Sequence, residues 1–247
     1  MNEMKLMMHL HRNNKRQGPG SEEATRLAIT LANIDKEKTY KIADIGCGTG
    51  AQTFTLAKEL KGEIIAVDLF NEFLEKLKET RKEAIATIIP MSASMDNLPF
   101  QQEEFDIIWS EGAVYNMGFK NGINYWKNFL KPGGILAVSE LSWTTNRRPE
   151  ELEDFWNGEY SEMDTVSGKI SVLEEAGYKV LGHFILPDNC WLDNYYHPLL
   201  DSHKDFLKKF GNDETARMIL ERDIQEADLY KKYKDYYSYG FYIAQKL

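Results

Sequence analysis

The chain has 247 residues and a formal net charge of −9, and 43% of its residues are hydrophobic. This acidity disfavours binding to nucleic acid or to an anionic membrane, and the densest basic patch, Arg12 with Lys15 and Arg16, reads as a short solvated face. Its two cysteines, Cys47 and Cys190, exclude a disulfide scaffold and a cysteine-ligated zinc site.

Near the start of the chain, the apolar stretch 6–10 is too short for a signal peptide or a membrane span, so we expect a cytoplasmic protein. The segment 16–21 then precedes a predicted helix that begins at Glu22, and Ser21 is a candidate N-cap for it. A second interpretation of the same segment is that it folds over a ligand, with Gln17 making polar contacts.

Strands and helices then alternate along the chain. Five apolar runs predict strands at 40–45, 63–68, 86–90, 105–109 and 135–140. Apolar residues at helical spacing lie between several of these runs, and residues 131–134 (Lys-Pro-Gly-Gly) predict a turn before the fifth. The alternation predicts a parallel sheet that is covered by helices on both faces.

The pattern changes after residue 140, because the segment 141–165 has no long periodic run. A helix that starts near Val166 leads to a predicted strand at 178–186. Two predicted helices, at about 196–210 and 213–234, precede a last strand with strict alternation. We expect the last two strands to pair antiparallel at one edge of the sheet.

These elements predict an α/β fold of the Rossmann-like type, with a mostly parallel seven-stranded sheet, an antiparallel last strand and helices on both faces. We expect a single domain over 1–247. Its cofactor-binding core is predicted at 22–140, and the segments 141–165 and 187–235 are predicted to be lid or substrate-side insertions.

A glycine cluster, Asp44-Ile45-Gly46-Cys47-Gly48-Thr49-Gly50, lies between the first predicted strand and the first of the alternating helices. Glycines let bare backbone approach a ligand, and the free N–H groups of the next helix attract negative charge. Asp68 ends the second strand, where a carboxylate can accept both hydroxyls of a ribose. The cluster predicts an adenosine-containing ligand, although Gly46-x-Gly48-x-x-Ala51 also meets the dinucleotide fingerprint.

Three features favour one kind of adenosine ligand. The anion of Asp44 disfavours a diphosphate and suits the ammonium group of a methionine moiety. Residues 93–100 follow the third strand, where an adenine edge can be read, and the turn at 131–134 precedes the fifth strand. Over residues 40–140 and the last strand pair, the chain resembles the class I S-adenosylmethionine-dependent methyltransferases, particularly small-molecule enzymes of the ubiquinone/menaquinone-biosynthesis type.

The resemblance implies S-adenosylmethionine as cofactor. Asp44 and the glycines would hold its methionine end, Asp68 its ribose and Leu69 its adenine. The family places an acidic residue where this chain has Ser94; Asp96 is either the substitute for it or, as we expect, a surface turn residue. The candidate cofactor-binding residues are Gln17, Gly18, Asp44, Gly46, Cys47, Gly48, Gly50, Asp68, Leu69, Ser94, Met95 and Ser110.

The methyl acceptor is expected beyond the carboxyl ends of the strands. Glu111 follows the fourth strand and Glu140 ends the fifth. We expect Glu111 or Tyr115 to orient or deprotonate the acceptor; alternatively, Glu111 caps the next helix and Trp143 belongs to the lid core. The aromatic stretch 190–197 is either a substrate wall, which favours a flat or apolar acceptor, or core or a homodimer interface.

The segment Ser110-Glu111-Gly112-Ala113 lacks the Asn-Pro-Pro-Tyr pattern of enzymes that methylate nucleobase amines. The five histidines show no metal-ligand spacing, so we expect no metal. The sequence hypothesis is an enzyme that transfers a methyl group by in-line displacement to a small molecule. The alternatives are a nicotinamide-dependent reductase and a non-catalytic module that binds S-adenosylmethionine.

Overall fold

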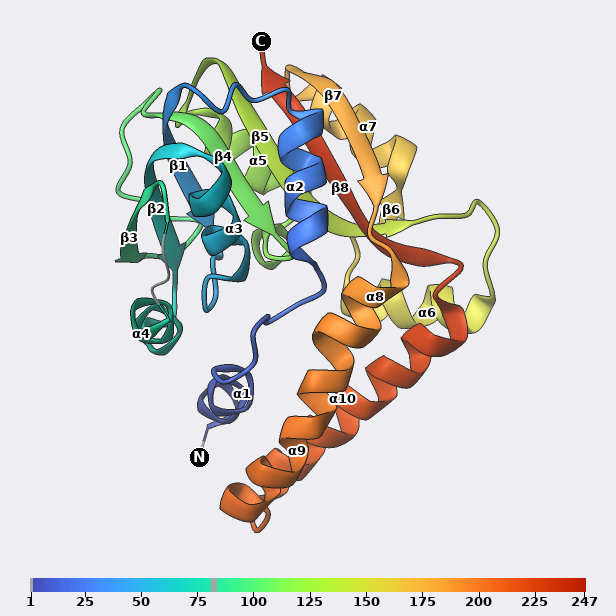
Figure 1. The fold of residues 1–247 in the computed structure, drawn as a ribbon. Helices are drawn as coiled ribbons and strands as arrows, with labels where there is room; N and C mark the ends of the chain where they lie inside the picture. Colours follow the sequence, from blue (N-terminus) through green and yellow to red (C-terminus); the bar gives the residue numbers. More distant parts are fainter. Residues whose placement is uncertain (1, 81–83) are drawn as a thin grey trace.

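The computed structural model describes residues 2–80 and 84–247, and its strands form one sheet in the order β3-β2-β1-β4-β5-β8-β7 (Figure 1). A short strand, β6, pairs with β5 outside this path. The strands are β1 (Thr39–Ile45), β2 (Lys61–Asp68), β3 (Thr87–Ser92), β4 (Phe105–Glu111), β5 (Leu130–Trp143), β6 (Asp164–Thr165), β7 (Tyr178–Ile185) and β8 (Tyr237–Lys246).

Helices connect most of these strands. They are α1 (Glu3–His11), α2 (Glu22–Leu31), α3 (Ala51–Glu59), α4 (Asn71–Glu79), η1 (Val114–Met117), α5 (Phe119–Lys127), α6 (Glu150–Glu159), α7 (Val166–Glu175), α8 (Asp188–Trp191), η2 (Leu192–Tyr196), α9 (His197–Phe210) and α10 (Glu214–Tyr233). Ser21 is the N-cap of α2, since its hydroxyl accepts a hydrogen bond from the Ala24 N–H.

The predicted fold class is confirmed. Strands β1 to β5 run parallel, while β8 lies antiparallel between β5 and β7. The helices α8, η2, α9 and α10 fill the excursion between β7 and β8, as the sequence predicts. The two-residue β6 was not predicted; it pairs with Ser142 and Trp143 because β5 continues beyond the predicted end at residue 140.

Other elements differ from the sequence prediction. The predicted turn at 131–134 lies inside β5, where Phe105 pairs with Leu130 but Ile107 pairs with Ile135, so the residues between bulge out of the ladder. Helices α1 and α6 were also not predicted. Both are short, and their buried residues, such as Leu6 and Trp156, pack on parts of the chain that are distant in sequence.

Each face of the sheet has its own apolar core. Helices α2 and α3 cover one face, where Ala28 and Leu56 pack with Trp109 of β4. Helices α5 and α7 cover the other, where Trp126 and Leu173 are fully buried (Figure 1). Because both faces of the sheet are buried, the central strands are continuous apolar runs in the sequence.

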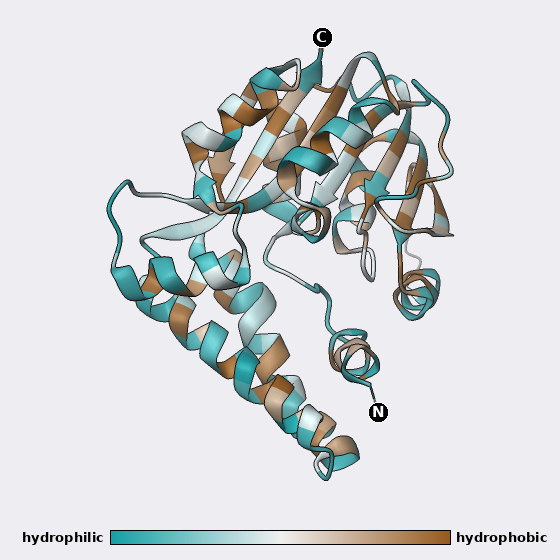
Figure 2. Ribbon diagram, turned by 180° about the vertical axis from the view of Figure 1, so that it is seen from behind, coloured by the Kyte–Doolittle hydropathy of each residue, from teal (hydrophilic) through white to brown (hydrophobic). Residues whose placement is uncertain are grey.

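A third group of helices lies beyond the carboxyl ends of the parallel strands (Figure 1). Helices α1, α9 and α10 share a small core, and along α9 and α10 apolar residues alternate with polar ones (Figure 2). We call α1, α6, α9 and α10 the cap. The residues of the small core are Leu6, Leu10, Leu199, Phe206, Ala216, Ile219 and Leu220.

Candidate active site

A cavity of about 1070 Å³ lies between the carboxyl edge of the sheet and the cap. The glycine turn (residues 46–50) and Asp68 line one end of it, and aromatic side chains from η1, α6, η2 and β8 line the other. This is the place where open α/β sheets bind their ligands, because the loops after the strands meet there.

The glycine turn presents bare backbone to this cavity. Gly46 and Gly48 have φ angles of +75° and +54°, a region that favours glycine. A Cβ at Gly46 would lie 2.4 Å from the Ala113 Cβ, and one at Gly48 would lie 2.3 Å from the Gln17 Oε1. The N–H groups of Gly46 and Cys47 both donate to the Val67 carbonyl at 2.9 Å, which fixes the turn to β2.

Asp68 is held at the end of β2 by two backbone N–H groups. Its Oδ2 accepts from the Gly48 N–H and its Oδ1 from the Phe70 N–H, each at 2.9 Å. Burial raises the pKa of Asp68, and these hydrogen bonds oppose that rise. Each oxygen retains acceptor capacity, so the half-buried carboxylate fits the two neighbouring hydroxyls of a ribose.

The residues beside Asp68 fit the rest of an adenosyl group. Leu69 is 55% exposed on the cavity wall, where an apolar side chain can lie against a planar ring. Ser94 and Met95 line the same region, and the Ser94 hydroxyl hydrogen-bonds the Asp96 carboxylate. Asp96 therefore lies on the cavity wall, consistent with its being the substitute acidic residue.

Three predicted cofactor residues lie off the cavity wall. Asp44 is fully buried beneath the turn and accepts hydrogen bonds from Thr53 (2.5 Å) and Gln52 (3.2 Å), while burial raises its pKa to about 7. Only its partner Gln52 reaches the wall. A Cβ at Gly50 would clash with the Leu77 side chain, so this glycine is needed for packing. Ser110 is fully buried. Their contact with the cofactor stays a prediction.

Residues 12–20, which we call the strap, cross from α1 to α2 over the glycine turn. The Gln17 Oε1 accepts the Thr49 N–H at 2.9 Å, and the Gln17 Nε2 donates to the carbonyls of His11 and Asn14, each at 3.1 Å. The predicted polar contacts of Gln17 thus reach the turn itself. Gly18 also lines the cavity, with open space around the position of a Cβ.

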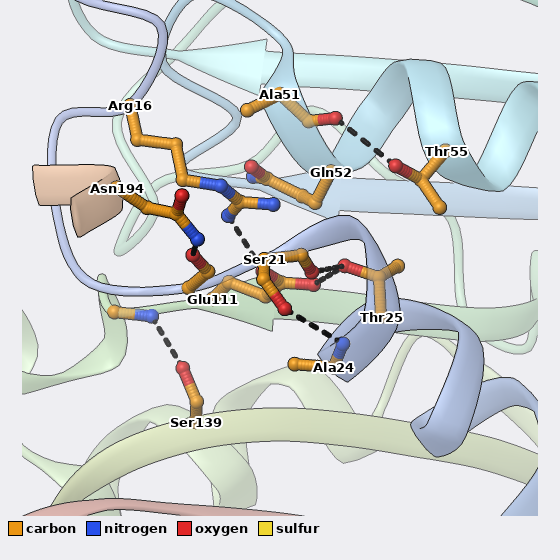
Figure 3. Close-up of polar contacts among 12 residues, drawn as sticks. Arg16, Ser21, Ala24, Thr25, Ala51, Gln52, Thr55, Glu111, Ser139 and Asn194 are labelled. Carbon is orange, nitrogen blue, oxygen red and sulfur yellow. Dashed lines mark hydrogen bonds and ion pairs between the residues drawn. The ribbon is translucent and has the colours of Figure 1, made fainter. Parts of the chain in front are cut away.

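Glu111 ties the strap to the sheet (Figure 3). Its Oε2 lies 3.1 Å from the Arg16 Nη1, and its Oε1 accepts hydrogen bonds from Thr25 (2.7 Å) and the Trp109 Nε1 (3.0 Å). The Arg16 and Glu111 side chains are only 9% and 3% exposed. The prediction that Arg16 belongs to a solvated face is therefore wrong, because its partner lies 95 residues away in the sequence.

The strap has two further anchors. The Asn194 Nδ2 donates to the Gly20 carbonyl at 2.9 Å (Figure 3), and the Gly20 N–H donates to the Cys190 carbonyl. A Cβ at Gly20 would lie 2.4 Å from the Arg16 Nη1, so a glycine is needed beside the ion pair. These contacts position Glu111 as an anchor of the strap; its predicted catalytic role stays a prediction.

Replacing Arg16 by methionine is expected to loosen the strap. The change leaves one oxygen of the buried Glu111 without its partner, which costs about 1–3 kcal/mol. We expect faster amide hydrogen exchange in residues 12–20 and little change in the β1–β2 region. Lys15→Met, at an exposed neighbouring position, is the control. Unchanged exchange in the strap of the Arg16 variant would contradict the anchoring role of the ion pair.

The far end of the cavity is aromatic. Tyr115 is 41% exposed there, and burial of its hydroxyl by the surrounding chain raises its pKa, so it is a neutral phenol that can hydrogen-bond an acceptor. From the stretch 190–197, Trp191 and Tyr195 line the cavity, while Cys190 and Tyr196 are core residues. The core interpretation thus holds for Cys190 and Tyr196, while the substrate wall and the homodimer interface stay predictions. Trp143 is a core residue, in line with the alternative interpretation that it belongs to the lid core.

Glu140 is fully buried close to this end. Its Oε1 accepts the Leu141 N–H at 3.0 Å, whereas its Oε2 and the Tyr160 hydroxyl have no hydrogen-bond partner among the described residues. Burial raises the pKa of Glu140 to about 7, and the buried ammonium of Lys169 acts in the opposite direction.

Glu140→Gln is expected to flatten the dependence of stability on pH. The folded protein holds the proton on Glu140 up to about pH 7, whereas the unfolded chain releases it near the ordinary glutamate pKa of about 4.3. The proton on Glu140 therefore stabilises the folded state fully below about pH 4.3. This stabilisation falls as the pH rises from there and is lost once the pH has passed 7. Denaturant titrations at about pH 5 and pH 8 measure the loss; an equal loss in both proteins would contradict the assignment.

Comparison with known proteins indicates the class of enzyme to which this site is similar. Residues 42–134 match the model of the methyltransferase domain family. The chain is 25% identical to the ubiquinone/menaquinone biosynthesis C-methyltransferase of Burkholderia multivorans, over 83% of this chain and 81% of that protein. It is also 25% identical to the demethylmenaquinone methyltransferase of Lactiplantibacillus plantarum, over 62% of this chain but only 65% of that protein's length.

The same fold is found in a solved methyltransferase. A crystal structure of an S-adenosylmethionine-dependent methyltransferase from Geobacter sulfurreducens, in complex with S-adenosyl-L-homocysteine, superposes with a TM-score of 0.80. It covers 98% of each chain at 17% sequence identity. An identity this low speaks for the fold and not for the substrate.

Residues 42–134 therefore form a methyltransferase domain, and the chain has the fold of the class I S-adenosylmethionine-dependent methyltransferases, for which S-adenosylmethionine is the methyl donor. Within that class it resembles the enzymes of quinone biosynthesis. The described residues contain no cluster of three or more histidine, cysteine, aspartate and glutamate side chains that could hold a metal ion. In the same part of the chain, no helix is both long and apolar enough to cross a bilayer.

Proposed function

We propose that the protein methylates a small-molecule acceptor that enters the aromatic end of the cavity. One observation carries the proposal: a single cavity joins the glycine turn and Asp68 to side chains of the cap. Its volume of about 1070 Å³ lies at the upper end of the range of small-molecule sites. A cofactor and an acceptor can therefore share one cavity.

S-adenosylmethionine supplies a methyl group that its sulfonium already activates, so the chain mainly has to align the reactants and exclude water. In our proposal, Asp68 holds the ribose hydroxyls and the bare backbone of Gly46 and Gly48 faces the methionine end. Leu69 packs against the adenine, and Ser94 with Asp96 meets its polar edge.

The remaining residues shape the acceptor side. The strap shields the glycine turn from water, since Gln17 holds it to that turn at Thr49 and Arg16 holds it to Glu111 of β4. Tyr115 presents a neutral hydroxyl that can orient an acceptor. The sequence prediction that Glu111 deprotonates the acceptor has less support, because both of its carboxylate oxygens already accept hydrogen bonds.

The nicotinamide-dependent reductase is the alternative with the same glycine spacing. Isothermal titration calorimetry with S-adenosylhomocysteine and with NADH separates the two. We expect S-adenosylhomocysteine to bind and NADH not to bind. The titrations are run at about pH 8, above the Asp44 pKa of about 7, because the ionised carboxylate beneath the turn repels a diphosphate there. Binding of NADH alone would contradict the proposal. The cytoplasmic location and the homodimer stay predictions from the sequence.

A further inference from the structure

The acceptor end of the cavity carries a group of side chains without a role so far. Tyr115 of η1, Tyr195 of η2 and Tyr239 of β8 line it together with Glu226 of α10. We call the three tyrosines the tyrosine cage. Burial raises the pKa of all three tyrosines, and the negative charge of Glu226 adds to that rise.

The tyrosine cage offers ring faces and free polar groups. Within the described part of the chain, the hydroxyls of Tyr195 and Tyr239 have no hydrogen-bond partner. Burial keeps all three phenols neutral by raising their pKa. Electron-rich rings of this kind attract a cation that lies within about 6 Å of the ring centre.

Glu226 lacks a cationic partner. Its Oε1 accepts the Tyr196 hydroxyl at 2.9 Å, but no lysine, arginine or histidine of the described residues forms an ion pair with it. The charge of Arg222 acts on Glu226, but Arg222 forms its ion pair with Glu3, and His203 pairs with Asp223. Burial raises the pKa of Glu226, because a carboxylate removed from water without a counter-ion is costly, and a cation bound beside it would favour the ionised form.

We propose that the acceptor is an organic amine, bound as its ammonium ion against the tyrosine cage with Glu226 as its counter-ion. This inference rests on the proposed function, since it names the acceptor class of the same cavity. An aromatic wall alone favours a flat or apolar acceptor, but the carboxylate of Glu226 changes the preference in favour of a cation. Glu226 is also placed to take the proton that an ammonium nitrogen must release before it can act as a nucleophile.

The test measures binding and not turnover. Two probes are titrated by calorimetry into the protein saturated with S-adenosylhomocysteine. One is choline, and the other is 3,3-dimethyl-1-butanol (dimethylbutanol), its uncharged analogue with carbon in place of the nitrogen. We expect choline to bind about tenfold more tightly than dimethylbutanol, because ring faces and a carboxylate act on the charge alone. Glu226→Gln should reduce this preference, leaving only the contribution of the rings, whereas Glu221→Gln, on the exposed side of α10, should keep it in full.

A second variant tests the rings separately from the carboxylate. Tyr115→Leu should weaken the binding of choline, while Tyr115→Phe, which retains the ring, should leave that affinity unchanged. Equal affinity for the two probes, or no binding of choline, would overturn the amine assignment. Failure of S-adenosylhomocysteine to bind would instead overturn the proposed function, so the two failures are distinguishable.

Discussion

Replacing Asp68 by alanine is expected to weaken the binding of S-adenosylhomocysteine about a hundredfold. Each hydrogen bond between a charged carboxylate and a ribose hydroxyl contributes about 1.5–3 kcal/mol, so the loss of two amounts to about 3 kcal/mol or more. The variant also loses the acceptor of the Gly48 N–H, which loosens the glycine turn. Calorimetry of the wild type and the variant measures the effect.

Two controls accompany this experiment. Glu75→Ala removes an exposed carboxylate from α4 and should leave the affinity unchanged. Asp68→Asn retains one carbonyl oxygen of the carboxylate and should give an intermediate loss. An affinity of the alanine variant within about twofold of the wild type, a free-energy change below about 0.5 kcal/mol, would remove Asp68 from the binding site.

Gly46→Ala should damage both the fold and the site. A residue with a side chain at a φ of +75° carries strain of about 1–2 kcal/mol. Its Cβ would lie 2.4 Å from the Ala113 Cβ, and relieving such overpacking by moving the backbone costs a further ~1–3 kcal/mol. We expect a lower unfolding midpoint in denaturant and a loss of S-adenosylhomocysteine binding.

Gly18→Ala is the matched control for this glycine. Gly18 lines the same cavity, but nothing lies within 4 Å of the position of its Cβ. The alanine there should leave the unfolding midpoint unchanged or slightly raised, because it reduces the freedom of the unfolded chain. Equal effects of the two substitutions would mean that the turn does not require a glycine at position 46.

The sequence predicts where the glycine turn and Asp68 lie in the fold, because the signals for them are local. The glycine turn and Asp68 stand at the ends of two adjacent strands, and parallel strands bring their carboxyl ends to one edge. Gly46, Gly48 and Asp68 all line the cavity. Asp44 and Gly50 belong to the same motif, yet they support it from below through Thr53 and Leu77. Spacing alone does not distinguish a residue that faces the ligand from one that holds the turn.

The acceptor end is harder to predict, because its residues meet only through tertiary packing. Arg16 pairs with Glu111 across 95 residues, and Tyr239 and Glu226 come from a strand and a helix with no motif of their own. Helix α1 has a weak apolar pattern and is held by α9 and α10, which lie near the other end of the chain. Amphipathic spacing predicts α9 and α10 themselves but not the cavity that they close.

A crystal structure of the protein with S-adenosylhomocysteine bound would show where the cofactor lies. We predict the ribose hydroxyls on the Asp68 carboxylate, the methionine end against the backbone of Gly46 and Gly48, and the sulfur facing the tyrosine cage. A ligand bound away from Asp68, or with its ribose turned towards the cap, would contradict this prediction.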